Sequence, residues 1–248
     1  MAKTRLDLLL VAQGLAESRT KAQALIMAGL VYHGEHKLDK AGAEFADDTE
    51  LTVRGKEHPW VSRGGMKLAK AIEEFSINVK GLVAMDVGSS TGGFTDVLLT
   101  YGVRKVYAVD VGHGQLDVKL RNDPRVVVME ETNARHLTKE MIGDAPDLIV
   151  CDTSFISLTK VLPAALALAK PTAQLVALIK PQFEVGKAEV SRGKGVIRDA
   201  ALHNQVCEDI TAWVRGLGWN VVGITKSPIT GPKGNVEFLL YATNEGAA

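Results

Sequence analysis

The hydrophobic positions of residues 1–57 recur at helical spacing and then give way to short extended segments. This spacing predicts a helix over Arg5–Ala16. Its apolar side is formed by Leu6, Leu9, Leu10 and Ala12. A second helix is expected over Arg19–Ala28, because Ser18 is a good N-cap and Gly29 a good left-handed terminator. The extended segments that follow are Leu30–Tyr32 and Glu50–Val53. Residues 1–57 are therefore predicted to form a small α+β domain.

From Val83 onward, apolar strands alternate with helices. The predicted strands are Val83–Val87, Lys105–Val111, Arg125–Glu130, Asp147–Asp152, Gln174–Lys180, Asn220–Lys226 and Val236–Ala242. The helices between them include Phe94–Tyr101, Leu158–Leu168 and Ala200–Leu217. This alternation predicts a parallel sheet covered on both faces. Only a proline- and glycine-rich segment, 227–235, joins the last two strands, so they are expected to pair antiparallel. The fold class is predicted to be α/β, with a seven-stranded, Rossmann-like sheet.

Composition sets limits on function. The 248 residues carry 29 basic and 29 acidic side chains, so net charge alone gives no argument for a nucleic-acid partner. Two cysteines without a CxxC pair favour a reduced, cytoplasmic setting and no metal site. The long apolar run Val161–Ile179 contains Lys170 and Pro171. A buried helix followed by a strand explains this run, and no membrane segment is expected.

A glycine-rich turn follows the first strand of the sheet, in residues 86–93. Glycines let a ligand approach the backbone, and the start of a helix favours polar or anionic groups. The order G-x-x-x-G-G departs from the G-x-G-x-x-G of dinucleotide sites. Asp86 suits the cationic amino-acid end of S-adenosylmethionine better than a pyrophosphate. Asp110, at the end of the next strand, is placed to bind the hydroxyls of an adenosine ribose.

S-adenosylmethionine is therefore the predicted cofactor. The residues predicted to bind it are Asp86, Gly88, Ser90, Gly92, Gly93, Phe94, Asp110 and Asn133. Asn133 is a candidate partner for the adenine ring, although a local turn explains this residue almost equally well.

Three polar residues stand at or near the ends of predicted strands, and a fourth lies on an earlier helix. Asp152 and Lys180 end the fourth and fifth strands, and Glu237 lies within the last strand. Because the carboxyl ends of parallel strands form the ligand crevice, Asp152 and Lys180 are expected to project into it. Lys67 lies on the helix before the sheet. One lysine–carboxylate pair is readily explained as an ion pair; only a match of all four positions to a known catalytic motif would favour catalysis.

The segment Ser62-Arg-Gly-Gly-Met-Lys67, the glycine loop and these polar positions resemble the FtsJ-type ribose methyltransferases. The whole chain resembles the TlyA family, known as hemolysins and as rRNA 2′-O-methyltransferases. The resemblance implies an alpha-L RNA-binding domain over 1–57, a linker over 58–66 and a methyltransferase domain over 67–248. It also implies a catalytic tetrad of Lys67, Asp152, Lys180 and Glu237. A ribose hydroxyl must lose its proton during transfer, and Lys180 is predicted to be the base.

Basic residues gather around the predicted crevice, in residues 54–70 and 180–198. The second segment is rich in glycine and is predicted to be a mobile loop that grips the substrate. The residues predicted to contact RNA are Arg5, Arg19, Lys21, Arg63, Lys187, Arg192 and Lys194. Ribosomal RNA or a ribosomal subunit is the expected partner, with local positive potential holding its phosphates.

Two other functions remain open from the sequence. The first is a non-enzymatic RNA-binding or ribosome-assembly factor that retains the fold. The second is the membrane-lysing activity implied by the hemolysin name, although neither an export signal nor a membrane segment is predicted. In residues 152–155 the sequence Asp-Thr-Ser-Phe lacks the Asn/Asp-Pro-Pro-aromatic motif common in nitrogen methyltransferases. An oxygen acceptor is therefore favoured over an exocyclic nitrogen.

Overall fold

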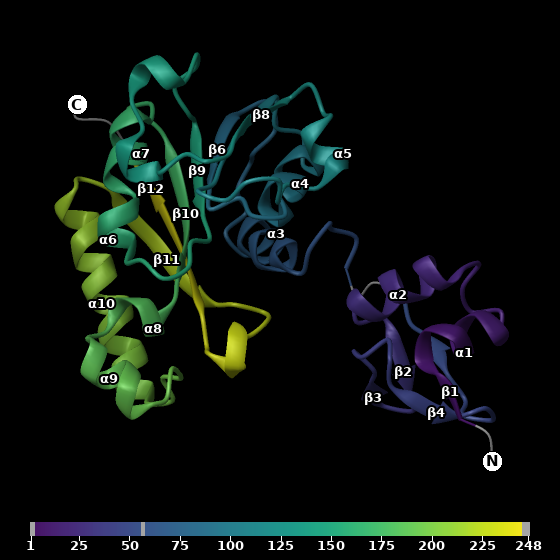
Figure 1. Ribbon diagram of the computed structural model, residues 1–248. Coiled ribbons are helices and arrows are strands. Elements are labelled where there is room, and N and C mark those ends of the chain that lie inside the picture. Colours follow the sequence, from purple (N-terminus) through teal and green to yellow (C-terminus); the bar gives the residue numbers. More distant parts are fainter. Residues whose placement is uncertain (1–2, 56–57, 245–248) are drawn as a thin grey trace. The chain divides into compact units, whose positions relative to one another are not determined.

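A computed structural model describes residues 3–55 and 58–244 of the chain (Figure 1). Two compact units divide between Pro59 and Trp60. The predicted linker, 58–66, is thus split between them, and the first helix of the second unit begins at Gly64. Each unit has its own hydrophobic core and is described separately.

The first unit packs two helices, α1 (Leu6–Ala12) and α2 (Arg19–Met27), beside short strands. β1 (Lys3–Arg5) pairs antiparallel with β4 (Glu44–Ala46). β2 (Val31–His33) pairs with both β3 (His36–Lys37) and β5 (Thr52–Val53). The buried core consists of Leu6, Leu9, Leu10, Ala16, Ala22, Ile26, Val31 and Leu51. Helix α1 ends earlier than predicted, and Ala12 is exposed instead of facing the core.

The second unit is built on a seven-stranded sheet in the order β11-β12-β10-β9-β6-β7-β8. Its strands are β6 (Val83–Val87), β7 (Lys105–Val109), β8 (Val126–Met129), β9 (Leu148–Cys151), β10 (Gln174–Ile179), β11 (Asn220–Lys226) and β12 (Phe238–Thr243). The first five strands pair parallel, whereas β12 inserts between β10 and β11 and is antiparallel to both. The predicted fold class is confirmed.

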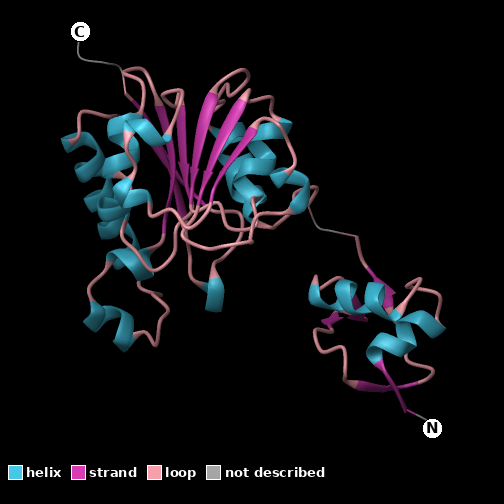
Figure 2. Ribbon diagram, turned by 45° about the horizontal axis from the view of Figure 1, so that its top comes forward, coloured by secondary structure: helices cyan, strands magenta, loops and turns pink. Residues whose placement is uncertain are grey.

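Helices cover both faces of this sheet (Figure 2). One face packs against α3 (Gly64–Glu74), α4 (Gly93–Thr100) and the short α5 (Val118–Arg121). The other packs against α6 (Leu158–Val161), α7 (Pro163–Leu168) and α10 (Ala200–Gly216). The single helix predicted over Leu158–Leu168 is interrupted at Leu162, because Pro163 has no N–H to donate and begins a new helix. All five residues of β6 are buried, as expected for a central parallel strand.

Short helical turns lie in the loops beside the sheet. They are α8 (Pro181–Glu184), α9 (Lys187–Arg192) and the 3-10 turns η1 (Ala134–His136), η2 (Lys139–Met141) and η3 (Pro232–Gly234). The segment predicted to be a substrate-gripping loop therefore contains two short helices. In the described ranges, no helix has the length and apolar character needed to cross a bilayer.

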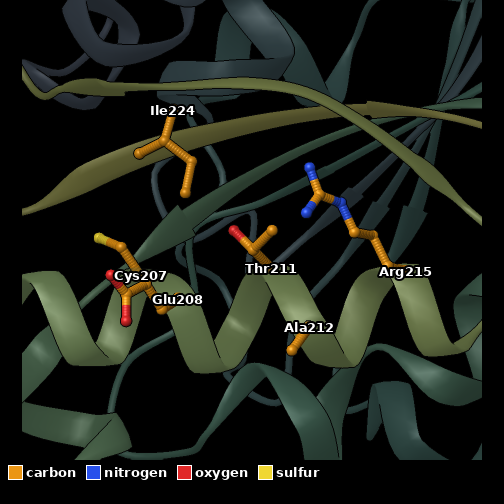
Figure 3. A pocket seen from close by; sticks show the side chains of 6 residues that line it. All are labelled: Cys207, Glu208, Thr211, Ala212, Arg215 and Ile224. Carbon is orange, nitrogen blue, oxygen red and sulfur yellow. The ribbon is translucent and has the colours of Figure 1, made fainter.

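A shallow depression lies between α10 and the edge strand β11 (Figure 3). Its lining consists of Cys207, Glu208, Thr211, Ala212, Arg215 and Ile224. None of these residues was predicted to belong to a site, and none lines the larger cleft of this unit.

Candidate active site

The loops at the carboxyl ends of the parallel strands surround a cleft of about 1450 Å³. Residues from the ends of β6, β7, β9 and β10 contribute to its walls. Parallel strands leave their carboxyl ends at one edge of the sheet, so side chains from distant parts of the chain meet there. The predicted catalytic residues Asp152, Lys180 and Glu237 all line this cleft.

The four predicted catalytic side chains form one ion-pair network. Lys67 Nζ lies 2.8 Å from Glu237 Oε2 and 3.2 Å from Asp152 Oδ2. Lys180 Nζ lies 2.6 Å from Asp152 Oδ1. It also donates a hydrogen bond to Ser154 Oγ, at 2.9 Å. Asp152 thus stands between two ammonium groups, and Lys67 lies behind the cleft wall rather than in its lining.

These charges are largely withdrawn from water. Glu237 is 1%, Lys180 6% and Lys67 7% exposed. Isolated buried charges are costly, so a balanced set of two carboxylates and two ammonium groups is the arrangement that such a site can tolerate. Burial opposes ionisation of Asp152, but Lys180 and Lys67 outweigh it, and the pKa of Asp152 lies below its ordinary value.

Local structure explains how each member reaches the network. Lys67 lies in the first half of α3, and Asp152 and Lys180 directly follow β9 and β10. Glu237 was predicted to lie within the last strand, but β12 begins one residue later, at Phe238. A Cβ atom at residue 231 would overlap the Glu237 carboxylate, so Gly231 leaves the space that this side chain occupies.

The cleft also contains half of the predicted cofactor residues: Gly88, Ser90, Asp110 and Asn133. The Asp110 carboxylate accepts hydrogen bonds from the backbone N–H groups of Ser90 (2.8 Å) and Gly112 (2.7 Å). It is therefore held in a fixed orientation at the end of β7. At Gly88, where φ is +84°, an added Cβ would lie 2.8 Å from the Thr153 side chain, so glycine lets the turn after β6 pack against the loop after β9. The residues present fit an adenosine-bearing cofactor.

The other predicted cofactor residues lie behind the loop and do not line the cleft; they are Asp86, Gly92, Gly93 and Phe94. Asp86 is fully buried, and its Oδ2 accepts a hydrogen bond of 2.7 Å from Thr95 Oγ1. Its Oδ1 has no partner among the described residues. Burial raises the pKa of Asp86 to about 7, although the bond from Thr95 acts in the opposite direction. These four buried residues therefore support the glycine-rich loop and do not face the cleft.

Asp86 is expected to make the stability of this unit depend on pH. Its folded-state pKa is raised, so its contribution is fully present below about pH 4 and is lost as the pH rises through about 7. An Asp86→Asn variant should therefore gain stability relative to the wild type between pH 5 and pH 8, on the order of 2 kcal/mol. Urea unfolding followed by tryptophan fluorescence measures this, because Trp60, Trp213 and Trp219 all lie in the second unit. Asp209→Asn, at an exposed position, is the control; a difference that does not vary with pH would contradict the expectation.

The sequence analysis missed Phe155, which lines the cleft, and Glu184, which does not. Phe155 is 90% exposed and has φ +66°, and its ring lies 5.1 Å from that of Phe183. Glu184 accepts hydrogen bonds from Ser157 Oγ (2.6 Å) and from the Leu158 backbone N–H (2.9 Å). It thereby ties the loop after β10 to the loop after β9. Phe155 and Glu184 stand close in sequence to Asp152 and Lys180, and this proximity was the available signal.

The predicted RNA-contacting residues are placed unequally. Arg19, Lys21, Arg63, Arg192 and Lys194 are exposed, and Arg5 is half-buried. The guanidinium of Arg192 pairs with Glu189 at 2.8 Å. The side chain of Lys187 lies outside the part that the structure describes. Arg135 and Lys160, which were not predicted, line the cleft and add positive charge to it.

Comparison with known proteins agrees with this geometry. Residues 60–244 match the FtsJ-like methyltransferase family, and residues 4–44 match the S4 domain. The 16S/23S rRNA (cytidine-2′-O)-methyltransferase TlyA of Mycobacterium tuberculosis is 50% identical over 240 residues, which is 96% of this chain and 89% of the relative. Hemolysin A of Brachyspira hyodysenteriae is 44% identical over 238 residues, covering 96% of this chain and 98% of the relative.

A solved structure from Streptococcus thermophilus that bears the hemolysin name aligns with a TM-score of 0.77 and 43% identity. The alignment covers 98% of this chain and 89% of that one. A SAM-dependent methyltransferase from Aquifex aeolicus aligns with a TM-score of 0.50 and 19% identity over 74% of this chain and 93% of its own length, which shows the fold alone.

Proposed function

Since this chain belongs to the FtsJ-like methyltransferase family and carries an S4 domain, we propose that it methylates the ribose 2′-hydroxyl of cytidine in ribosomal RNA. S-adenosylmethionine is the proposed methyl donor, and ribosomal subunits in the cytoplasm are the proposed partners. The name of the TlyA relative from Mycobacterium tuberculosis gives this reaction, and that from Campylobacter jejuni, 38% identical over 182 residues, gives it for 23S rRNA.

The observation that carries the proposal is the position of the Lys180 amine. It reaches the wall of the cleft and is fixed there by Asp152 at 2.6 Å and Ser154 at 2.9 Å. A ribose hydroxyl is a weak nucleophile, and a held amine within reach of it is the group that its deprotonation requires. The exposed ring of Phe155 lines the same cleft.

The cofactor would lie at the carboxyl ends of β6 and β7, whereas Lys180 follows β10, on the other side of β9. Asp110 would accept hydrogen bonds from the ribose hydroxyls of the cofactor, and the turn at Gly88, packed against Thr153, would line its site. Asn133 would contact the adenine ring. When bound, S-adenosylmethionine supplies an electrophilic methyl group on its sulfonium.

To act as the base, Lys180 would first release its own proton to solvent; its neutral amine would then accept the proton of the 2′-hydroxyl as that oxygen is methylated. Asp152 stabilises the ammonium group that forms, because its Oδ1 lies 2.6 Å from Nζ. Lys67 does not enter the cleft; its ammonium holds Asp152 and Glu237 in place from behind. The protein therefore contributes positioning and proton removal.

RNA as the substrate is supported by the rim of the cleft. Exposing an aromatic ring to water is unfavourable, and such a ring offers a stacking surface to an unpaired base. Phe155 and Phe183 together provide a surface of this kind. Arg135 and Lys160 supply positive charge for phosphates in the same cleft.

Ribose-methylation mapping tests the proposal. Ribosomes from cells without this protein are expected to lack at least one 2′-O-methylcytidine, and the wild-type gene is expected to restore it. The Lys180→Ala gene serves as the matched control that should not restore it. The modified position also shows which ribosomal subunit is the substrate. Identical methylation with and without the protein would refute the proposed reaction.

A further inference from the structure

The first unit contains a fully buried carboxylate, Asp7, on helix α1. It accepts hydrogen bonds from Arg5 through Nε and Nη2, both at 3.1 Å. It also accepts from Arg19 Nε at 2.9 Å and from Gln23 Nε2 at 2.8 Å. One carboxylate therefore joins β1 and α1 to α2 through three side chains.

The carboxylate is ionised in the folded protein. The hydrogen bond from Arg5 is the largest influence and outweighs the burial that opposes it, with Gln23 and Arg19 adding to the effect. The pKa of Asp7 is accordingly held well below its usual range. A buried anion of this kind needs its partners, and both arginine partners are drawn to it from the surface.

Each guanidinium keeps donors for a further ligand. The side chains of Arg5 and Arg19 are 43% and 54% exposed. Arg19 contacts Asp7 only through Nε, so both of its terminal nitrogens have no acceptor among the described residues. Arg5 uses Nε and Nη2 and likewise retains Nη1. Each planar guanidinium group is thus held by Asp7 through one edge, and the nitrogens of its other edge point away from the carboxylate.

We propose that Arg5, Arg19 and Asp7 form a preassembled clamp for the backbone phosphates of RNA, in which Asp7 is the positioning residue. The inference rests on the proposed RNA substrate and adds how the first unit holds it. Free guanidinium edges are donors only, and their planar geometry matches phosphate oxygens. The clamp has a net charge of +1, because one carboxylate faces two guanidinium groups. It grips phosphates and gives no base preference.

An Asp7→Asn variant separates this role from simple electrostatics. The substitution makes the unit more positive by one charge, so charge alone predicts tighter RNA binding. The clamp predicts weaker binding, because asparagine offers one acceptor oxygen and releases at least one guanidinium. We expect about a tenfold rise in Kd, since two long side chains must be ordered again on binding. Asp47→Asn removes the same charge at an exposed position and should bind at least as tightly as the wild type.

The measurement uses the full chain and a transcribed ribosomal RNA fragment, with Kd determined over a range of salt concentrations. Hydrogen exchange of α1 and α2 shows whether the Asp7→Asn unit is folded. If it is not, Arg5→Lys/Arg19→Lys keeps Asp7 and both charges but loses the forks, and it should also bind several-fold more weakly. Wild-type affinity in the folded Asp7→Asn protein, or in the double lysine variant, would overturn the clamp. If the wild type itself neither bound nor methylated the RNA, the proposed function would fail instead.

Discussion

A Lys180→Ala variant is expected to transfer methyl groups about a thousandfold more slowly than the wild type in single-turnover assays. The methyl side chain of alanine cannot accept the ribose proton. Among the described residues, Lys67 is the other lysine paired with Asp152, and its Nζ is engaged with Glu237 and Asp152 behind the wall. Cofactor affinity, measured by calorimetry, should change little, because Lys180 follows β10, whereas Gly88, Ser90 and Asp110 follow β6 and β7, with β9 between them in the sheet.

A Lys180→Arg variant tests whether the role is that of a base or of a positive charge. Arginine keeps the charge beside Asp152 but is not deprotonated under ordinary conditions, so it should be almost as inactive as alanine. Lys139→Ala, at an exposed position of the same unit, should retain full activity. If Lys180→Arg kept more than about a tenth of the wild-type rate, proton transfer to this residue would be excluded.

The second large effect is expected from Lys67→Met, which should destabilise the second unit by about 3–5 kcal/mol and abolish activity. The substitution leaves Glu237, which is 1% exposed, without its ammonium partner, and Asp152 with only Lys180. A buried charge stripped of its partner carries the full cost of its desolvation. Urea unfolding followed by tryptophan fluorescence measures this loss.

Two variants show whether the loss comes from the unpaired charge. Lys67→Met/Glu237→Gln removes both charges and should recover most of the stability while remaining inactive. Lys70→Met lies one turn further along α3, where its pair with Glu74 is partly exposed, and should cost no more than about 0.5 kcal/mol. If Lys67→Met and Lys70→Met lowered the free energy of unfolding equally, the buried network would contribute no more to stability than the partly exposed pair of Lys70 and Glu74.

The sheet was predictable from the sequence because its signal is local. Parallel strands buried on both faces appear as continuous apolar runs, and each ends at a polar residue or a glycine. Asp152 and Lys180 could be placed from this alone, since they follow β9 and β10 directly. The predictions were less accurate at the ends of elements, where the local pattern is weakest. The last strand begins one residue after Glu237, and the helix predicted over Leu158–Leu168 is divided at Pro163.

The first unit shows the limit of such patterns. Helical spacing placed Leu6, Leu9 and Leu10 in its core, and they are buried. The same spacing places Leu8 away from this apolar side, and it is 43% exposed, but the spacing gives no reason for Asp7 to be buried. Asp7 is buried because Arg5, Arg19 and Gln23 close over it, and this contact exists only once α1 packs against α2.

The sequence by itself determined the order of strands and helices and the glycine turn after β6, because these depend on neighbours along the chain; the four residues of the predicted tetrad came from the family resemblance. Only the tertiary structure decided which charges meet. The pairing of Lys67 with Glu237, 170 residues away, and the removal of both from water follow from the packing of α3 beside the inserted strand β12. Electrostatic energies depend on distance and burial, and neither is encoded in the spacing of residues along the chain.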